Sequence, residues 1–223
     1  MTDIEILDKF KRIAVYGGSF DPIHRGHMAI AESVMEQFAL DVVVFVPAFH
    51  APHKKRDRPT PALDRYAMVC LATNDTSRLI ATRIEIEAPE RPYSVQTLTT
   101  LKRELPAAEL FFIIGADSWA EITTWREWET VLTLTNHIVV TRPGYPITFD
   151  HVTTGVRERI LDLRGIEGVP VGHGGPMIYI SDAVDLDISA TAIREKVRGG
   201  DDSWKLDVPE EVAKYVEKYQ IYS

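Results

Sequence analysis

Two histidines stand three residues apart, shortly after a pair of glycines, in the segment Gly17-Gly18-Ser19-Phe20-Asp21-Pro22-Ile23-His24-Arg25-Gly26-His27. The glycine pair lets backbone N–H groups approach a polyphosphate, because a side chain at either position would hold the ligand away. If a helix has begun by His24, the imidazoles of His24 and His27 project from one face at its positive end. A lone histidine is more often a capping or packing residue, but two at this spacing favour a phosphate site.

A second group of polar residues lies late in the chain, in the segment Ile188-Ser189-Ala190-Thr191-Ala192-Ile193-Arg194. Ser189 or Thr191 can cap a helix whose free N–H groups then face an anion, and Arg194 adds a permanent positive charge. Alternatively, Ser189 caps an ordinary helix and Arg194 lies on its solvated side. Spacing alone does not decide between these two interpretations.

The elements that would position these residues alternate between strand and helix. The first pair is a strand at Ile13–Tyr16 and a helix at Gly26–Phe38 with one apolar face. The runs Val42–Val46 and Leu110–Ile114 are apolar throughout, as strands buried on both faces require. We therefore predict an α/β fold, a Rossmann-like doubly wound parallel sheet with helices on both faces. We expect it to form a single domain over residues 1–223, with a helical part at about 189–223.

The same alternation continues along the rest of the chain. Further apolar runs lie at Leu63–Leu71, Leu79–Ile86 and Val95–Leu105, and we expect strands at His137–Thr141 and Met177–Ile180 and helices at Trp125–Leu132, Val156–Leu163, Ala190–Val197 and Glu210–Tyr219. The stretch Gly144–Gly175 is less regular, and we expect a peripheral connection there. Ligands of such sheets bind beyond the carboxyl ends of the strands, where the strand order reverses, so residues directly after strands are the first candidates for a site.

Composition limits the classes of protein that the chain can belong to. Its formal net charge of -8 argues against a broad nucleic-acid surface, because such surfaces are basic. The chain has no run of 18 apolar residues, and its beginning, Met1 to Lys11, lacks the pattern of a secretory signal. Its single cysteine, Cys70, fits a reducing compartment. We expect a cytoplasmic protein that binds neither nucleic acid nor a membrane, as a monomer or a homo-oligomer.

Taken together, the two polar segments resemble the nucleotidyltransferase superfamily. Its signature pairs a Gly-rich turn with T/H-x-G-H, here His24-Arg25-Gly26-His27, and places I-S-x-T-x-I-R late in the chain, as in residues 188–194. The resemblance implies ATP as a substrate, Mg²⁺ bound with the ATP and no dedicated protein cage for the metal. It implies His24, His27 and Arg194 as catalytic residues. The ATP-binding residues that it implies are Gly17, Gly18, Ser19, Phe20, His24, His27, Gly115, Asp117, Ile188, Ser189, Thr191 and Arg194.

From about Arg12 to Tyr222, the chain is similar to the bacterial nicotinate-nucleotide adenylyltransferase family. Four stretches carry this resemblance: Val46-Pro47 with Pro52-His53-Lys54, Tyr93-Ser94-Val95-Gln96-Thr97-Leu98, Ile114-Gly115-Ala116-Asp117-Ser118 with Trp125, and Thr141-Arg142-Pro143-Gly144. The family's acceptor is nicotinate mononucleotide. The resemblance implies that it is held by Ser19, His53, Lys54, Tyr93, Ser94, Asp117, Trp125 and Arg142. Trp125 would stack on the nicotinate ring, and N–H groups around Tyr93 and Ser94 would bind the ring carboxylate.

Some features leave alternatives open. Arg126 stands where some relatives have an aromatic residue, and Trp119 and Trp128 are neighbouring alternatives to Trp125. Asp117 is placed to hold a ribose hydroxyl, but it can equally be a helix cap. The acceptor could instead be nicotinamide mononucleotide or phosphopantetheine. Outside this group of enzymes, the alternatives are a non-catalytic nucleotide sensor and a class I aminoacyl-tRNA synthetase core, although the chain lacks the second lysine-rich signature of the latter.

Overall fold

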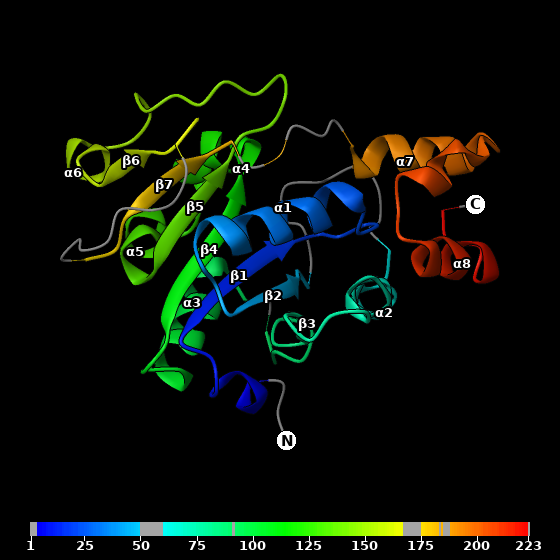
Figure 1. Cartoon of the computed structure of the whole chain (residues 1–223), viewed down its shortest axis with the longest axis horizontal. Helices are drawn as coiled ribbons and strands as arrows, with labels where there is room; N and C mark the ends of the chain where they lie inside the picture. Colours follow the sequence, from blue (N-terminus) through cyan, green and yellow to red (C-terminus); the bar gives the residue numbers. More distant parts are fainter. Residues whose placement is uncertain are drawn as a thin grey trace.

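A parallel sheet of seven strands forms the centre of the protein, which we describe from a computed structural model over residues 4–49, 60–90, 92–166, 175–182, 184 and 188–222. Its strands are β1 (Arg12–Gly18), β2 (Val42–Pro47), β3 (Leu79–Ala81), β4 (Glu109–Gly115), β5 (Asn136–Val140), β6 (Ile160–Asp162) and β7 (Ile178–Ser181). They lie in the order β3-β2-β1-β4-β5-β7-β6, with every neighbouring pair parallel (Figure 1).

Helices connect these strands and extend beyond the sheet. The α-helices are α1 (Arg25–Gln37), α2 (Ala62–Thr73), α3 (Ser94–Glu104), α4 (Ala116–Ala120), α5 (Trp128–Leu134), α6 (Thr154–Arg157), α7 (Ala190–Arg198) and α8 (Glu210–Lys218). Three short 3-10 turns among the described residues are η1 (Glu5–Leu7), η2 (Ile122–Thr124) and η3 (Asp202–Leu206).

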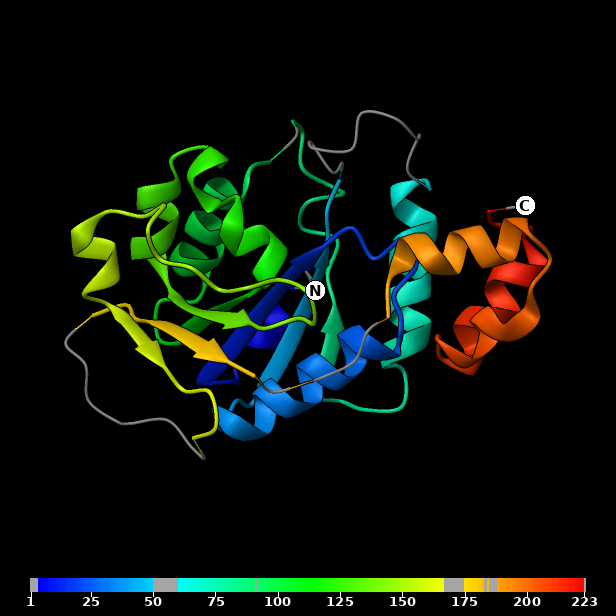
Figure 2. The same ribbon diagram turned by 90° about the horizontal axis from the view of Figure 1, so that it is seen from above.

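Alternate residues of the central strands enter two separate cores, because successive side chains of a strand point to opposite faces. Ala14 and Tyr16 of β1 pack in the same core as α1, whereas Ile13 and Val15 pack in the core that contains α3 and α5. Figure 2 shows α1 on one side of the sheet and the α3 and α5 helices on the other. The predicted doubly wound parallel sheet with helices on both faces is therefore confirmed.

The strand order reverses between β1 and β4. The chain first places β2 and then β3 on one side of β1, and it then returns so that β4 pairs with the other side. Within this central pair, Tyr16 is in register with Ile113. The carboxyl ends of β1 and β4 are thus the point at which this fold leaves room for a ligand.

Three expected elements differ from the structure. The prediction of a helix at Val156–Leu163 is wrong, because α6 ends at Arg157. Residues Ile160–Asp162 instead form the edge strand β6, which pairs with β7. The stretch 144–175 is therefore not only a peripheral connection. The run Leu79–Ile86 is a strand only as far as Ala81. The helix expected to begin at Trp125 begins at Trp128, after η2.

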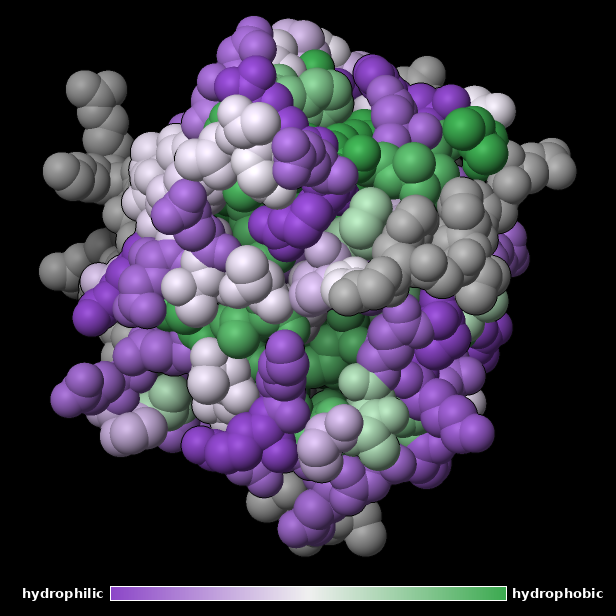
Figure 3. Space-filling view, turned by 90° about the vertical axis from the view of Figure 1, so that its left-hand side faces the viewer, coloured by the Kyte–Doolittle hydropathy of each residue, from purple (hydrophilic) through white to green (hydrophobic). Residues whose placement is uncertain are grey.

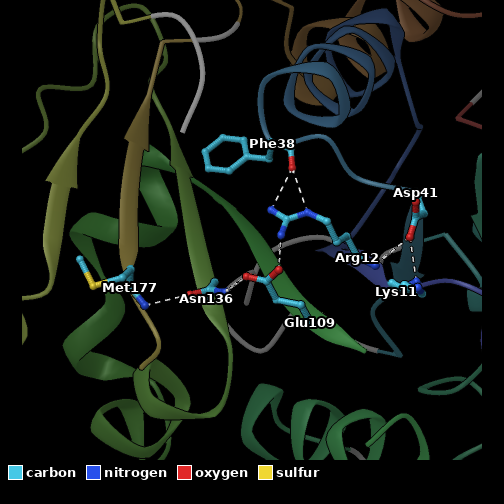
Figure 4. A network of polar contacts seen from close by, with 7 residues as sticks. All are labelled: Lys11, Arg12, Phe38, Asp41, Glu109, Asn136 and Met177. Atoms are coloured by element: carbon cyan, nitrogen blue, oxygen red, sulfur yellow. Dashed lines mark hydrogen bonds and ion pairs between the residues drawn. The ribbon is translucent and has the colours of Figure 1, made fainter. Parts of the chain in front are cut away.

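Polar contacts join the amino ends of the strands, opposite the ligand edge (Figure 4). The guanidinium of Arg12 donates to the Phe38 carbonyl and pairs with Glu109 of β4. Asn136 donates to Glu109 at 3.1 Å and accepts from the Met177 N–H at 2.9 Å. This network links β1, β4, β5 and the residue before β7, so it fixes the strands at the edge away from the candidate site.

On the side of the molecule where α6 and β6 lie, the surface contains both apolar and hydrophilic residues. Figure 3 shows apolar residues in patches between hydrophilic ones on that face. No helix in the described part of the chain is long and apolar enough to cross a membrane.

Candidate active site

The turn after β1 carries the first motif, and we call residues 17–27 the phosphate turn. Gly17 and Gly18 end β1, and a Cβ on Gly18 would lie only 2.9 Å from the ring of Phe20. This glycine is therefore required by packing, whether or not a ligand is bound. Phe20 is buried and has a backbone φ of 47°, in the left-handed region. The turn then reaches His24, the residue directly before α1.

His24 and His27 form a stacked pair at the beginning of α1. Their ring centroids are 3.7 Å apart with an interplanar angle of 25°. The backbone N–H of His24 donates to Nδ1 of His27 at 3.2 Å, so Nδ1 of His27 is unprotonated and its neutral ring carries the proton on Nε2. His24 is buried, and its Nδ1 has no hydrogen-bond partner among the described residues. A buried ring nitrogen without a partner is a position at which a ligand atom or a water would bind.

The surroundings keep both imidazoles neutral. Burial and then the charge of Arg142 lower the pKa of His24 to about 4, and Asp207 opposes the shift. For His27 the pKa is also well below its ordinary value, because of burial first and then because of His24 and Arg142. The ring of His27 packs edge-on against Phe20 at 5.0 Å. In the free protein, the two side chains are therefore neutral hydrogen-bonding groups rather than cations.

The second motif begins α7. Ser189 is its N-cap, and its hydroxyl accepts from the Ala192 N–H at 3.1 Å, so Ser189 rather than Thr191 is the capping residue. The guanidinium of Arg194 donates to the Asp21 carbonyl at 2.7 Å and to the Thr191 hydroxyl at 3.3 Å. Arg194 thus lies against the phosphate turn and not on a solvated face of the helix.

Two further contacts bring the motifs together. A Cβ on Gly26 would lie 3.1 Å from Nδ1 of His24, which it would crowd, and 3.6 Å from Cβ of Ile188, which is ordinary contact. Arg142, which follows β5, donates to the Ile188 carbonyl at 3.2 Å, and its charge acts on both imidazoles. The ends of β1 and β5 and the beginning of α7 therefore meet around the histidine pair.

Asp117 lies at the end of β4, in the first turn of α4. Its side chain is folded back over Gly115, since a Cβ on that residue would lie 2.6 Å from Oδ1 of Asp117. Burial and then the charge of Asp117 raise the pKa of the Tyr16 hydroxyl on β1. The exposed carboxylate thus stands at the switch point of the sheet, beside the strand that leads to the phosphate turn.

Two of the residues expected to bind the acceptor, Tyr93 and Ser94, stand at the beginning of α3. Tyr93 precedes this helix and is 44% exposed, with its N–H bonded to the Gln96 side chain at 2.7 Å. The N–H of Ser94 has no acceptor among the described residues. The guanidinium of Arg126 lies over the Tyr93 ring, 4.9 Å from its centroid. Residue 126, where some relatives have an aromatic side chain, therefore contacts Tyr93 directly.

Of the three neighbouring tryptophans, the structure excludes Trp119 as a stacking residue and leaves Trp125 and Trp128 as alternatives. Trp125 is half-buried and lies between η2 and α5, with its ring edge-on to Phe112 at 6.3 Å. Trp119 is buried in the core, and its indole N–H is bonded to the Thr148 carbonyl at 2.9 Å, so it is not available. Trp128 is the first residue of α5 and is also half-buried. His53 and Lys54 lie outside the residues that the structure describes.

Arg65 is a residue of this region that the motifs did not indicate. It is 1% exposed, and its guanidinium donates to the carbonyls of Ser19 and Ala48, each at 2.6 Å, and to that of Thr60 at 3.0 Å. It thereby links the turns after β1 and β2 to the beginning of α2. A signal was present in the sequence, because Arg65 stands at the spacing of the buried positions of α2, which include Met68.

Within the described residues, no group of three or more His, Cys, Asp or Glu side chains could hold a metal ion. The donors of the candidate site are instead neutral imidazoles, a guanidinium and backbone N–H groups. Such a set is suited to phosphate oxygens rather than to a bare divalent cation, which prefers carboxylate and carbonyl oxygens.

The chain matches the model of the cytidylyltransferase-like family over residues 15–196. The chain is 39% identical over 217 residues to the probable nicotinate-nucleotide adenylyltransferase of Desulfatibacillum aliphaticivorans, covering 95% of this chain and 99% of the relative. It is 35% identical over 206 residues to the protein of the same name from Corynebacterium jeikeium, covering 92% and 98%. The chain therefore belongs to the nicotinate-nucleotide adenylyltransferase family.

A solved structure has the same fold. The nicotinic acid mononucleotide adenylyltransferase of Plasmodium falciparum, complexed with NaAD, matches with a TM-score of 0.69 and 20% identity, over 95% of this chain and 97% of that chain. At this identity the match supports the fold alone.

Proposed function

We propose that this protein transfers the adenylyl group of ATP to nicotinate mononucleotide, which gives nicotinate adenine dinucleotide and pyrophosphate. The observation that carries the proposal is the meeting of the two motifs: Arg194 of α7 is bonded to the phosphate turn, and Ile188 lies beside Gly26, between the two histidines. Membership of the nicotinate-nucleotide adenylyltransferase family supports the choice of reaction.

The triphosphate would lie at the beginning of α1. Nε2–H of His27 and the imidazole of His24 would face α and β phosphate oxygens, with Arg194 supplying a permanent charge. The free N–H groups at the beginning of α7, which Ser189 caps, would add further donors. Asp117 would hold a ribose hydroxyl, as its exposed position at the end of β4 allows.

In the reaction, a phosphate oxygen of the acceptor forms a bond to the α-phosphorus, and the bond from that phosphorus to the bridging oxygen breaks. The electron pair leaves on pyrophosphate. The attacking phosphate has a second pKa of about 6 and is already ionised at neutral pH, so no general base is needed. Catalysis therefore rests on positioning and on stabilising the charge that develops around the five-coordinate phosphorus. Neutral imidazoles serve this purpose because they donate hydrogen bonds at neutral pH.

Mg²⁺ would enter with ATP as part of the substrate. It would bridge phosphate oxygens and keep most of its waters, so it needs few protein ligands. The donor set of the site fits this arrangement, because it offers hydrogen bonds to the phosphates, whose other oxygens would bind the metal.

The acceptor would lie between the beginning of α3 and Trp125. Trp125 would stack on the pyridine ring, and the N–H of Ser94 would bind the ring carboxylate. A carboxylate accepts at both of its oxygens, whereas the NH₂ of an amide cannot accept, so an amide would leave unpaired any donor that faces that NH₂, which would disfavour nicotinamide mononucleotide. Arg142 would face the phosphate of the acceptor, where its charge is close to the histidine pair.

Pyrophosphate release tests the proposal. The protein is mixed with MgATP and with nicotinate mononucleotide, nicotinamide mononucleotide or phosphopantetheine, each supplied alone. We expect the largest kcat/KM with nicotinate mononucleotide, at least about tenfold above that with the amide. No release with any acceptor would refute the enzymatic assignment, and release with phosphopantetheine alone would refute the acceptor.

A further inference from the structure

The carboxylate of Asp21, in the middle of the phosphate turn, is held from two distant parts of the chain. The hydroxyl of Tyr222, which follows α8, donates to Oδ1 of Asp21 at 2.7 Å. The backbone N–H of Thr60 faces Oδ2 at 3.4 Å. Both oxygens of this carboxylate therefore have donors inside the protein, which leaves Asp21 a structural group of the turn rather than a ligand of the substrate.

The backbone on both sides of this hydrogen bond is held in the left-handed region. Tyr222 has a φ of 75°, and Phe20, the residue before Asp21, has a φ of 47°. Large L-residues adopt this conformation only where the surrounding structure holds them in it. The contact between Tyr222 and Asp21 therefore joins two segments whose backbone is held in this conformation. The fold imposes the geometry of the contact.

Asp21 also holds Arg194. Its carbonyl oxygen accepts from the Arg194 guanidinium at 2.7 Å, and Asp21 stands three residues before His24. A shift of Asp21 would therefore move both the arginine and the turn that leads to the histidine pair. Burial and the neighbouring Asp21 raise the pKa of the Tyr222 hydroxyl, so it remains a protonated donor at neutral pH.

We infer that Tyr222 is a positioning residue for the proposed adenylyl transfer: through Asp21 it holds the phosphate turn and Arg194 in the geometry that the triphosphate requires. This inference rests on the proposed function, because it assigns Tyr222 to the ATP side of that site. Tyr222 touches no reacting atom.

The chain offers a matched control for the test. The hydroxyl of Tyr215 on α8 donates to Oδ1 of Asp64 on α2, also at 2.7 Å. Tyr222→Phe and Tyr215→Phe thus each remove one tyrosine–aspartate hydrogen bond of equal length, but only the first bond reaches the phosphate turn. We expect Tyr222→Phe to lower kcat/KM for MgATP about tenfold, because small misplacements of positioned groups cost up to about 10²-fold in rate. Tyr215→Phe should stay within about twofold of wild type at a similar loss of Tm.

A binding measurement separates this inference from the proposed reaction. Titration with MgATP alone, without an acceptor, should give a Kd several-fold weaker for Tyr222→Phe than for Tyr215→Phe, even if nicotinate mononucleotide proves to be the wrong acceptor. Asp21→Ala also removes the contact with the Thr60 N–H, so it should lose at least as much affinity as Tyr222→Phe, and the double variant should be no worse than Asp21→Ala, because the tyrosine contact is already absent in it. Equal Kd values for the two phenylalanine variants, or additive losses in the double variant, would overturn the inference.

Discussion

At the scale of single residues, the buried histidines share one electrostatic property. His24 and His27 are neutral because burial outweighs every charge near them that would favour protonation. His137 of β5 shares this property without belonging to the site. It is 0% exposed, its Nδ1 is 3.0 Å from the Thr135 carbonyl, and burial lowers its pKa from 6.5 to about 4.

The folded protein should consequently lose stability as the pH falls from about 6.5 to about 4. In that window the unfolded chain binds a proton at His137 that the folded chain does not, so protonation favours unfolding. A shift of this size corresponds to about 3 kcal/mol. Urea unfolding at a series of pH values should show a shallower loss in His137→Leu than in wild type, by up to that amount. Parallel curves for the two proteins would show that His137 is not buried as a neutral group.

At the scale of elements, Arg65 of α2 holds the turns that follow β1 and β2 at the carboxyl edge of the sheet. Arg65→Met would leave the carbonyls of Ser19, Ala48 and Thr60 without their donor. We expect the free energy of unfolding to fall by about 3 kcal/mol or more, and turnover to fall with it. Arg103→Met is the control, because that side chain is 70% exposed and, among the described residues, pairs only with its neighbour Glu104, so its loss should cost less than about 0.5 kcal/mol. Equal losses in the two variants would contradict the role given to Arg65.

The elements also show which local patterns can be interpreted without a structure. Strands that are apolar along their whole length, such as β2, could be predicted to be buried on both faces, because exposing either face to water is unfavourable. β6 was missed, because a strand of three residues is defined by its pairing with β7, which a local pattern does not contain. The start of α5 was missed because Trp125 fits the apolar spacing of a helix that begins three residues later.

For the molecule as a whole, the site is a meeting of segments far apart in the sequence. Its histidine and arginine motifs could be predicted, because each is short and has a physical function of its own. The contact of Arg194 with Asp21 spans 173 positions and that of Tyr222 spans 201, so neither could be derived from spacing. α7 carries Arg194 to the phosphate turn, and α8, which is bonded to α2 through Tyr215 and Asp64, leads to Tyr222.

Turnover of His24→Ala and His27→Ala, with MgATP and nicotinate mononucleotide both saturating, tests most directly whether these imidazoles act on the triphosphate. Each substitution removes a preorganised donor to developing charge, so we predict that kcat falls on the order of 10²-fold or more. Tm should remain near that of wild type, and this result would show that the fold is intact. A kcat within a few-fold of wild type in both variants would contradict the placement of the triphosphate at the histidine pair.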